Sequence, residues 1–183
     1  IRLAGEDGVA AYGVLAYVSF IFAAIFLGYA VGSAPIVSFH YGAEHPDELK
    51  SLLRKSLTLM GLGGIAMTLL SFALSAPVSR IFVGYDAELY AMTVRGFRIF
   101  SVAFLLCGFN IYGSAFFTAL NNGLISAVIS FLRSLVFQSV CVLLLPVFLG
   151  IDGIWLALLA SELLSLTVTF YFLARNGKKY QYI

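Results

Sequence analysis

Two charged side chains stand deep inside apolar stretches of this sequence. Arg133 follows Leu124 by nine residues, and Glu162 follows Gly153 by nine. At 1.5 Å per helical residue, each lies about 13 Å from the start of its own stretch. If the two stretches run antiparallel through a slab about 30 Å thick, the levels of the two charges differ by only about 4 Å. A long arginine side chain can close that gap, so the spacing predicts an ion pair.

Such a pair has two interpretations, and the sequence leaves both open. A charge at this depth costs about 3 kcal/mol or more and normally faces an aqueous cavity or a partner. Arg133 and Glu162 are therefore candidates for the pathway of a transported cation or proton. Alternatively, the pair fixes the register of two helices. Weaker polar candidates for the same cavity, each of which can equally bond to another helix, are Asn110, Tyr112 and Gln138.

The composition places these residues in a membrane protein. Hydrophobic residues make up 61% of the 183 and charged residues 11%, with a mean hydropathy of +0.99. Soluble proteins are roughly half apolar and a quarter charged. Lipid can cover apolar surface that a core of this size cannot hide. A net charge of +2 is too small to indicate nucleic-acid binding, so we expect membrane lipid and no nucleic acid as a partner.

Five apolar stretches are long enough to cross a bilayer, which takes about 20 helical residues. Strands of a barrel would be about ten residues long with alternating polarity. These stretches are longer and apolar on all sides, so the predicted fold class is an all-α, polytopic transmembrane helix bundle. The predicted spans are residues 14–39, 57–78, 99–120, 124–149 and 154–174.

Basic residues are more frequent on one side of this predicted bundle. The side with the connector 41–55 and the C-terminus carries Lys50, Arg54, Lys55, Arg175, Lys178 and Lys179. The opposite side carries Arg2, Arg80, Arg95 and Arg98. The positive-inside rule then predicts a multi-pass protein of the inner or plasma membrane with a cytoplasmic C-terminus.

The chain opens with Ile1 and has no segment that is typical of a signal peptide. We therefore expect a fragment cut from a longer chain. Cys107 and Cys141 lie inside apolar runs without any cluster of metal-ligand spacing, so we interpret them as small core residues and predict no metal site. No GxSxG, HExxH or P-loop motif occurs, and we do not expect an enzyme.

The first span contains residues that affect helix packing and bending. Gly28 and Gly32 form a GxxxG motif, which allows another helix to approach closely. Pro35 removes one backbone donor and should kink the helix. A kink there serves either as a hinge or as an adjustment for packing.

Several short motifs resemble those of one transporter family. Residues 28–43 read GYAVGSAPIVSFHYGA, which resembles a hallmark of the MATE (multidrug and toxic compound extrusion) family, a glycine-rich helix with a G-x-x-P-[IL]-[IV] core and a final tyrosine–glycine–alanine step. The preceding GVAAYG at 8–13 is similar to the entry to that helix. Downstream, FRI at 97–99 and FFTAL at 116–120 fit a later helix, and LP at 145–146 with GIDGIW at 150–155 is similar to the final hairpin.

The resemblance implies twelve helices in two six-helix lobes. This chain would supply five spans of the C-terminal lobe, and the N-terminal lobe of the same chain would be its missing partner. Such a protein is an antiporter for multidrug efflux. It exports small organic cations or amphipathic drugs and toxicants by alternating access, with transported H⁺ or Na⁺ as the coupling ion and no other cofactor.

One position separates the branches of this family. One branch carries a coupling carboxylate in the N-terminal lobe, and another binds the cation with carboxylates of the C-terminal lobe. Counted back from Gly113 and Ser114, the acidic position of the third span falls near Cys107, which is not acidic. The pattern is therefore closest to the bacterial DinF-like and MepA-like branch.

Two other functions stand beside this one. The first is a flippase of the same superfamily for lipid-linked oligosaccharides, whose cavity should be strongly cationic to receive a pyrophosphate. The second is a non-transporting membrane scaffold subunit, which would use its polar residues for helix contacts alone.

Overall fold

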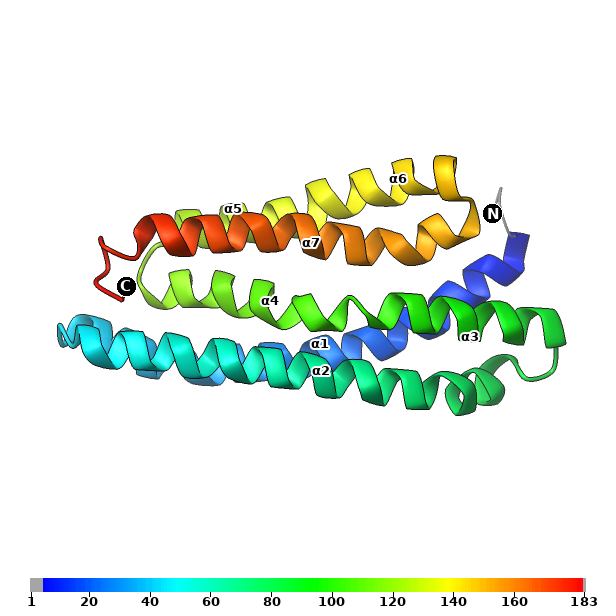
Figure 1. Cartoon of the computed structure of the whole chain (residues 1–183), viewed down its shortest axis with the longest axis horizontal. Coiled ribbons are helices and arrows are strands. Elements are labelled where there is room, and N and C mark those ends of the chain that lie inside the picture. The colour runs from blue at the N-terminus through cyan, green and yellow to red at the C-terminus, as the bar shows by residue number, and fades with distance from the viewer. Residues whose placement is uncertain (1–4, 183) are drawn as a thin grey trace.

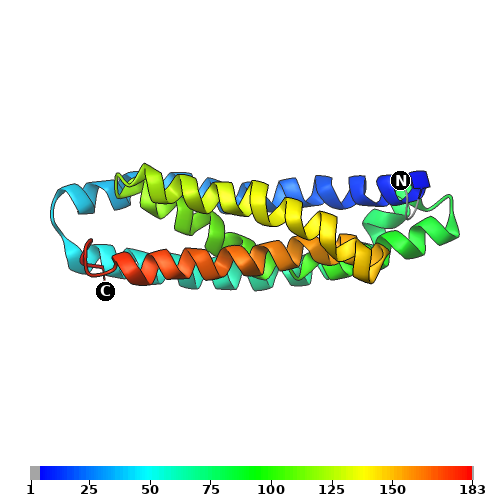
Figure 2. The same cartoon turned by 90° about the horizontal axis from the view of Figure 1, so that it is seen from above.

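Helices provide all the regular structure in residues 5–182, the part of the chain that this computed structural model describes. Arg2 lies outside that range. The helices are α1 (Gly5–Gly42), α2 (Pro46–Val83), α3 (Ala87–Ser101), α4 (Phe104–Ala119), α5 (Gly123–Phe131), the π-helical segment η1 (Leu132–Phe137), α6 (Gln138–Leu149) and α7 (Ile151–Asn176). They lie side by side as a long, flat bundle (Figures 1 and 2).

The bundle has the dimensions and surface of a transmembrane domain. Residues 5–42, 46–83, 123–149 and 151–176 are each long and apolar enough to cross a bilayer, and the bent pair α3–α4 makes a fifth such span. Large apolar side chains cover the outside, among them Phe20, Leu69, Leu143 and Phe148. Hydroxyl side chains such as Ser71 and Thr169 are buried inside instead. These findings confirm the all-α transmembrane bundle.

The third span differs from its predicted form. Residues 99–120 were expected to form one helix, but the helical path begins at Ala87 and bends by 47° between α3 and α4. At the bend the amides of Val102 and Ala103 bond three residues back, to Ile99 and Phe100, so the α-helical ladder is interrupted. The Ser101 carbonyl accepts a hydrogen bond from Thr68 Oγ1 at 3.2 Å. A side chain of α2 therefore satisfies a backbone group at the break.

Neutral hydroxyl groups line the contact between α2 and this break. Buried serines recur every four residues along α2, so they share one face of the helix. The hydroxyls of Ser71 and Ser101 bond to each other, and Arg98 Nε donates to Ser75 Oγ at 3.5 Å. We call this set the hydroxyl seam, and its members are Thr68, Ser71, Ser75, Ser79 and Ser101.

The turns alternate between two ends of the bundle. The α1–α2 turn, the α4–α5 turn and the C-terminus lie together at one end, and the α2–α3 and α6–α7 turns lie at the other (Figure 1). At the first end, Asn122 Nδ2 donates to the Tyr180 hydroxyl at 2.8 Å, and the Tyr182 hydroxyl donates to the Leu173 carbonyl at 2.9 Å. Burial, with Tyr180 beside it, raises the pKa of Tyr182, so this hydroxyl remains a neutral donor at physiological pH.

The GxxxG motif does not bring two helices of this chain together. A Cβ atom on Gly28 or Gly32 would meet no atom within 4 Å, so no helix of residues 5–182 packs against these two glycines. The close approach occurs at Gly64 instead, where a Cβ would lie 2.9 Å from the Phe104 carbonyl oxygen. Helix α1 continues through Pro35 to Gly42, and a hinge at Pro35 stays a prediction.

Candidate functional site

The span that carries Arg133 contains a π-helical turn. Helix α5 begins at Gly123 and is capped by Asn122, whose side chain accepts a hydrogen bond from the Ile125 amide at 3.2 Å. The helix changes to π geometry over Leu132–Phe137 and returns to α geometry at Gln138. Single π turns inside α-helices occur frequently at functional sites. Arg133 lies on this turn, one residue after it begins.

Arg133 and Glu162 form the predicted ion pair. Arg133 Nη2 lies 2.7 Å from Glu162 Oε1, and Nε lies 3.0 Å from Oε1 and 3.1 Å from Oε2. Two nitrogens of the guanidinium thus face the carboxylate, which is the strong geometry for this pair. The spacing argument from the two apolar stretches was therefore correct about the contact between η1 and α7.

Asn110 and Thr169 extend the pair into a hydrogen-bonded cluster. Asn110 Nδ2 donates to Glu162 Oε2 at 2.7 Å and to the Glu162 backbone carbonyl at 3.0 Å. Thr169 Oγ1 donates to Asn110 Oδ1 at 2.9 Å. The close approach of α4 and α7 depends on Gly113, because a Cβ there would collide with the Thr169 methyl group. Asn110 is thus a partner of Glu162 and is itself buried.

Cys107 also belongs to this cluster. Its Sγ accepts a hydrogen bond from Arg133 Nη2 at 3.3 Å, so the side chain is more than the small core residue that its apolar neighbours predicted. The thiol is buried, and so is that of Cys141 on α6. We call Cys107, Asn110, Arg133, Glu162 and Thr169 the Arg133–Glu162 cluster.

A cavity of about 170 Å³ borders the cluster. Arg133, Gln138 and Glu162 line it, as do Cys107 from α4 and Tyr12 and Ser19 from α1. The Arg133 side chain is 23% exposed and the Glu162 side chain 2%. The remaining lining residues are small or apolar and come from α1, α3, α4 and α7: Ala16, Phe20, Ala23, Phe100, Phe104 and Leu158.

The structure brings four of the five polar candidates together and separates the fifth. Arg133, Gln138 and Glu162 line the cavity, and Asn110 lies behind Glu162. Tyr112 belongs to a different part of the core, where its ring lies 6.0 Å from that of Tyr29. Side chains two residues apart differ in direction by about 200° around the axis of an α-helix. Asn110 and Tyr112 therefore cannot face the same cavity.

Sequence reasoning missed Thr169 and the lining residues from α1. Thr169 lies seven residues after Glu162, which is two turns along the same helix face. That spacing was a usable signal. Tyr12 and Ser19 also lie seven residues apart, but no candidate residue on α1 marks that face, and their place in the cavity depends on how α1 packs against α3 and α4.

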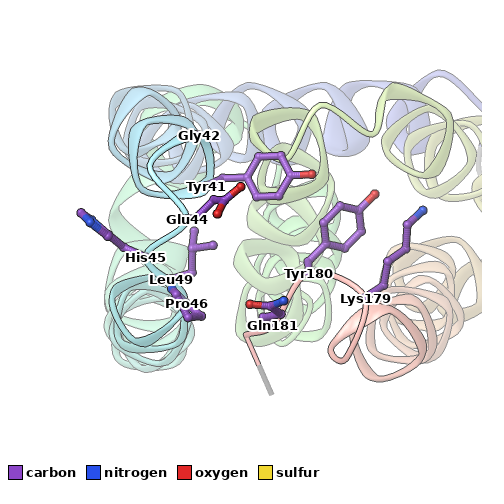
Figure 3. A pocket seen from close by; sticks show the side chains of 9 residues that line it. All are labelled: Tyr41, Gly42, Glu44, His45, Pro46, Leu49, Lys179, Tyr180 and Gln181. Carbon is purple, nitrogen blue, oxygen red and sulfur yellow. The ribbon is translucent and has the colours of Figure 1, made fainter.

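A second hollow, of about 440 Å³, lies at the end with the C-terminus. Tyr41 lines it from the end of α1 and Glu44 from the α1–α2 turn, and Tyr180 and Gln181 line it from the C-terminal residues (Figure 3). The His45 side chain points away from Tyr180 in this view. None of the candidate polar residues lines this hollow, so the cavity beside Arg133 is the candidate site.

Solved structures of transporters share the fold of this bundle. An outward-facing multidrug resistance MATE family transporter of the MOP superfamily matches with a TM-score of 0.91 at 19% identity, over 100% of this chain and 41% of that chain. An inward-facing one matches with 0.92 at 18% identity, over 99% and 42%. The Vibrio cholerae MATE transporter VcmN in its bent form matches with 0.88 at 17% identity, over 100% and 42%. This chain thus spans about two fifths of their length.

The sequence itself carries a family match as well. The MatE family model matches residues 1–143, a range that includes α1 to α5, Arg133 and Gln138. The comparison with curated proteins gave no match. The branch within the family stays a prediction. Because the sequence match covers most of the chain and the bundle has the same fold along its whole length, this chain belongs to the MatE family.

Proposed function

We propose that this chain forms the C-terminal lobe of a cation-coupled antiporter that exports cationic or amphipathic compounds. In this proposal the lobe works with an N-terminal lobe, and H⁺ or Na⁺ entry drives export by alternating access. Membership of the MatE family supports transport as the function. The cavity beside the Arg133–Glu162 cluster supports a pathway along this lobe.

The observation that carries the proposal is the equal likeness to two opposite states. The bundle matches an outward-facing relative with a TM-score of 0.91 and an inward-facing relative with 0.92. One lobe can resemble both states only if its internal structure hardly changes between them. Such constancy is what rocking of two rigid lobes about a shared site requires.

The Arg133–Glu162 pair is suited to sense what occupies the cavity. Both Glu162 oxygens accept hydrogen bonds, from Arg133 and from Asn110. An ion or ligand that draws one partner away leaves the other charge buried and uncompensated, which is strongly unfavourable. Occupancy of the cavity is thereby linked to the contact between η1 and α7.

The two alternative functions fit the cavity less well. A pyrophosphate calls for several basic groups, whereas Arg133 is the single basic residue among the described lining residues and is already paired. A scaffold subunit needs no cavity at a buried ion pair. We therefore favour the exporter over the flippase and the scaffold.

The proposed orientation follows from the two ends of the bundle. The end with the α1–α2 turn and the C-terminus carries the larger group of basic residues, which supports a cytoplasmic position in the inner or plasma membrane.

Ion-driven transport tests the proposal. The protein as its gene encodes it is reconstituted into liposomes, and movement of the fluorescent cation ethidium is followed under an imposed H⁺ or Na⁺ gradient. We expect ethidium movement that stops when an ionophore removes the gradient. Glu162→Gln should slow it, whereas Asp152→Asn, in an exposed pair with Arg95, should leave it unchanged. Movement that is independent of both gradients would contradict the antiporter.

A further inference from the structure

The ion pair presents its positive partner to the cavity. Glu162 is 2% exposed, whereas Arg133 is 23% exposed. The contacts of the guanidinium with Glu162 and Cys107 use Nε and Nη2. Among the contacts of the described residues, Nη1 is thus left free to bond to a ligand. A molecule in the cavity meets a cationic hydrogen-bond donor first, and the carboxylate lies behind it.

The rest of the lining offers another donor and an aromatic wall. The Gln138 amide lines the same cavity and can donate from its NH₂ group. The rings of Tyr12 and Phe100 meet edge to face with centroids 6.5 Å apart, and those of Phe100 and Phe104 do so at 6.3 Å. Aromatic faces of this kind pack well against a flat ring of a ligand.

The size of the cavity limits how much of a ligand it can hold. Sites for whole drug-sized molecules measure about 300 Å³ or more. A cavity of about 170 Å³ accommodates one ring with one polar substituent. The remainder of a larger ligand must extend out of this cavity.

We propose that this cavity binds the acidic end of an aromatic amphipathic substrate, with Arg133 holding its carboxylate. The inference rests on the proposed function and names the substrate class of the same site. The free Nη1 group of the guanidinium donates charge-assisted hydrogen bonds to the carboxylate oxygens. Gln138 adds a donor, and Tyr12, Phe100 and Phe104 pack against the ring. The favoured substrates are zwitterions, because a cation without an acidic group meets a like charge here.

A matched pair of dyes tests the inference without any transport step. An unesterified rhodamine carries a free benzoate, and its methyl ester replaces that carboxylate with a neutral group that is larger by one methyl. Fluorescence polarisation gives the affinity of the protein for each dye. We expect the protein to bind the free acid more tightly than the ester.

Two variants should move this preference in opposite directions. Glu162→Gln removes the competing carboxylate, so the preference for the acid should grow several-fold. The double variant R133Q/E162Q removes the cation without leaving a buried charge unpaired, and the preference should fall about tenfold, as expected for the loss of charged hydrogen bonds. Because the ester serves as a reference in every variant, a general loss of folding would lower both affinities and leave their ratio unchanged.

Arg133→Lys keeps the charge but removes the planar fork, and it should give an intermediate preference. The inference is overturned if the ester binds as tightly as the acid to the unchanged protein, or if the double variant keeps the preference.

Gradient-driven ethidium movement reports separately on the proposed function. If that movement persists while the dye preference is absent, the transporter stands and the substrate class is wrong. If gradient-driven movement of both ethidium and the rhodamine acid is absent while the preference is present, the site stands and the antiporter fails.

Discussion

Two spans of this bundle depart from a plain α-helix, and they do so with different chemistry. The α3–α4 break is supported by neutral hydroxyls, with Thr68 donating to the Ser101 carbonyl. The π turn of η1 instead carries Arg133, which is paired with Glu162 beside a cavity. A hydroxyl satisfies a freed backbone group at little cost, so the hydroxyl seam is suited to packing. A buried charge costs far more than a hydroxyl, and its place at a cavity supports the proposed pathway.

The largest expected effect comes from breaking the buried ion pair. Arg133→Gln leaves Glu162 buried without its counter-charge and should lower the free energy of unfolding by about 3–5 kcal/mol. Denaturant unfolding in detergent micelles measures this loss. The matched control is Arg95→Gln, because Arg95 pairs with Asp152 where both side chains are substantially exposed, at 69% and 36%. That exposed pair should contribute less than about 1 kcal/mol. Equal losses for the two variants would contradict the distinction between the two pairs.

A smaller loss should follow from filling the space at the α3–α4 break. In Gly64→Ala the new Cβ would lie 2.9 Å from the Phe104 carbonyl oxygen and 3.0 Å from Leu105 Cα. Both atoms are backbone and cannot rotate away, so we expect a loss of about 1–3 kcal/mol in the same unfolding measurement.

Gly32→Ala is the control, since its Cβ would meet open space. Alanine is favoured over glycine inside a helix by about 1 kcal/mol, so this variant should be neutral or slightly more stable. A larger loss at Gly32 than at Gly64 would mean that the GxxxG face of α1 packs against another helix in the assembled protein.

The smallest effect is expected within the hydroxyl seam. A double-mutant cycle with Ser71→Ala and Ser101→Ala should give a coupling free energy of about 0.6 kcal/mol, typical of hydrogen bonds between transmembrane helices. Neither variant should change the affinity for the dyes. A changed affinity ratio between the rhodamine acid and its ester would show that the seam takes part in the site.

The ion pair was predictable because depth along two apolar stretches fixes the level of each charge. The bend was not, because residues 101–104 contain neither proline nor glycine. The backbone group freed at the break is satisfied by Thr68 on another helix, whose position no local pattern reveals. Cys107 was missed for a related reason. The apolar neighbours of Cys107 in the sequence describe only its own helix. The contact of Cys107 with Arg133 depends on the packing of α4 against η1.

The bounds of the first two spans show the same limit. Residues 14–39 and 57–78 were read from hydropathy, yet α1 and α2 extend over 5–42 and 46–83. Hydropathy marks the part of a helix that suits lipid, and the helix itself continues for as long as its backbone bonds are made. The start of α2 agrees with its sequence, since Pro46 lies in the first turn with Asp47 and Glu48 behind it.

The central claim is that Arg133 and Gln138 line a transport pathway while the outer face of the same span meets lipid. The access of water to the cavity face tests this claim. Gln138→Cys and Leu143→Cys are compared by their rate of reaction with a charged, water-soluble thiol reagent in native membranes. Leu143 is 72% exposed on the bundle surface, and the buried Cys107 and Cys141 of the unchanged chain set the baseline. We predict that the cysteine at position 138 reacts several-fold faster than the one at 143. A faster reaction at 143, or baseline reactivity at 138, would contradict the pathway.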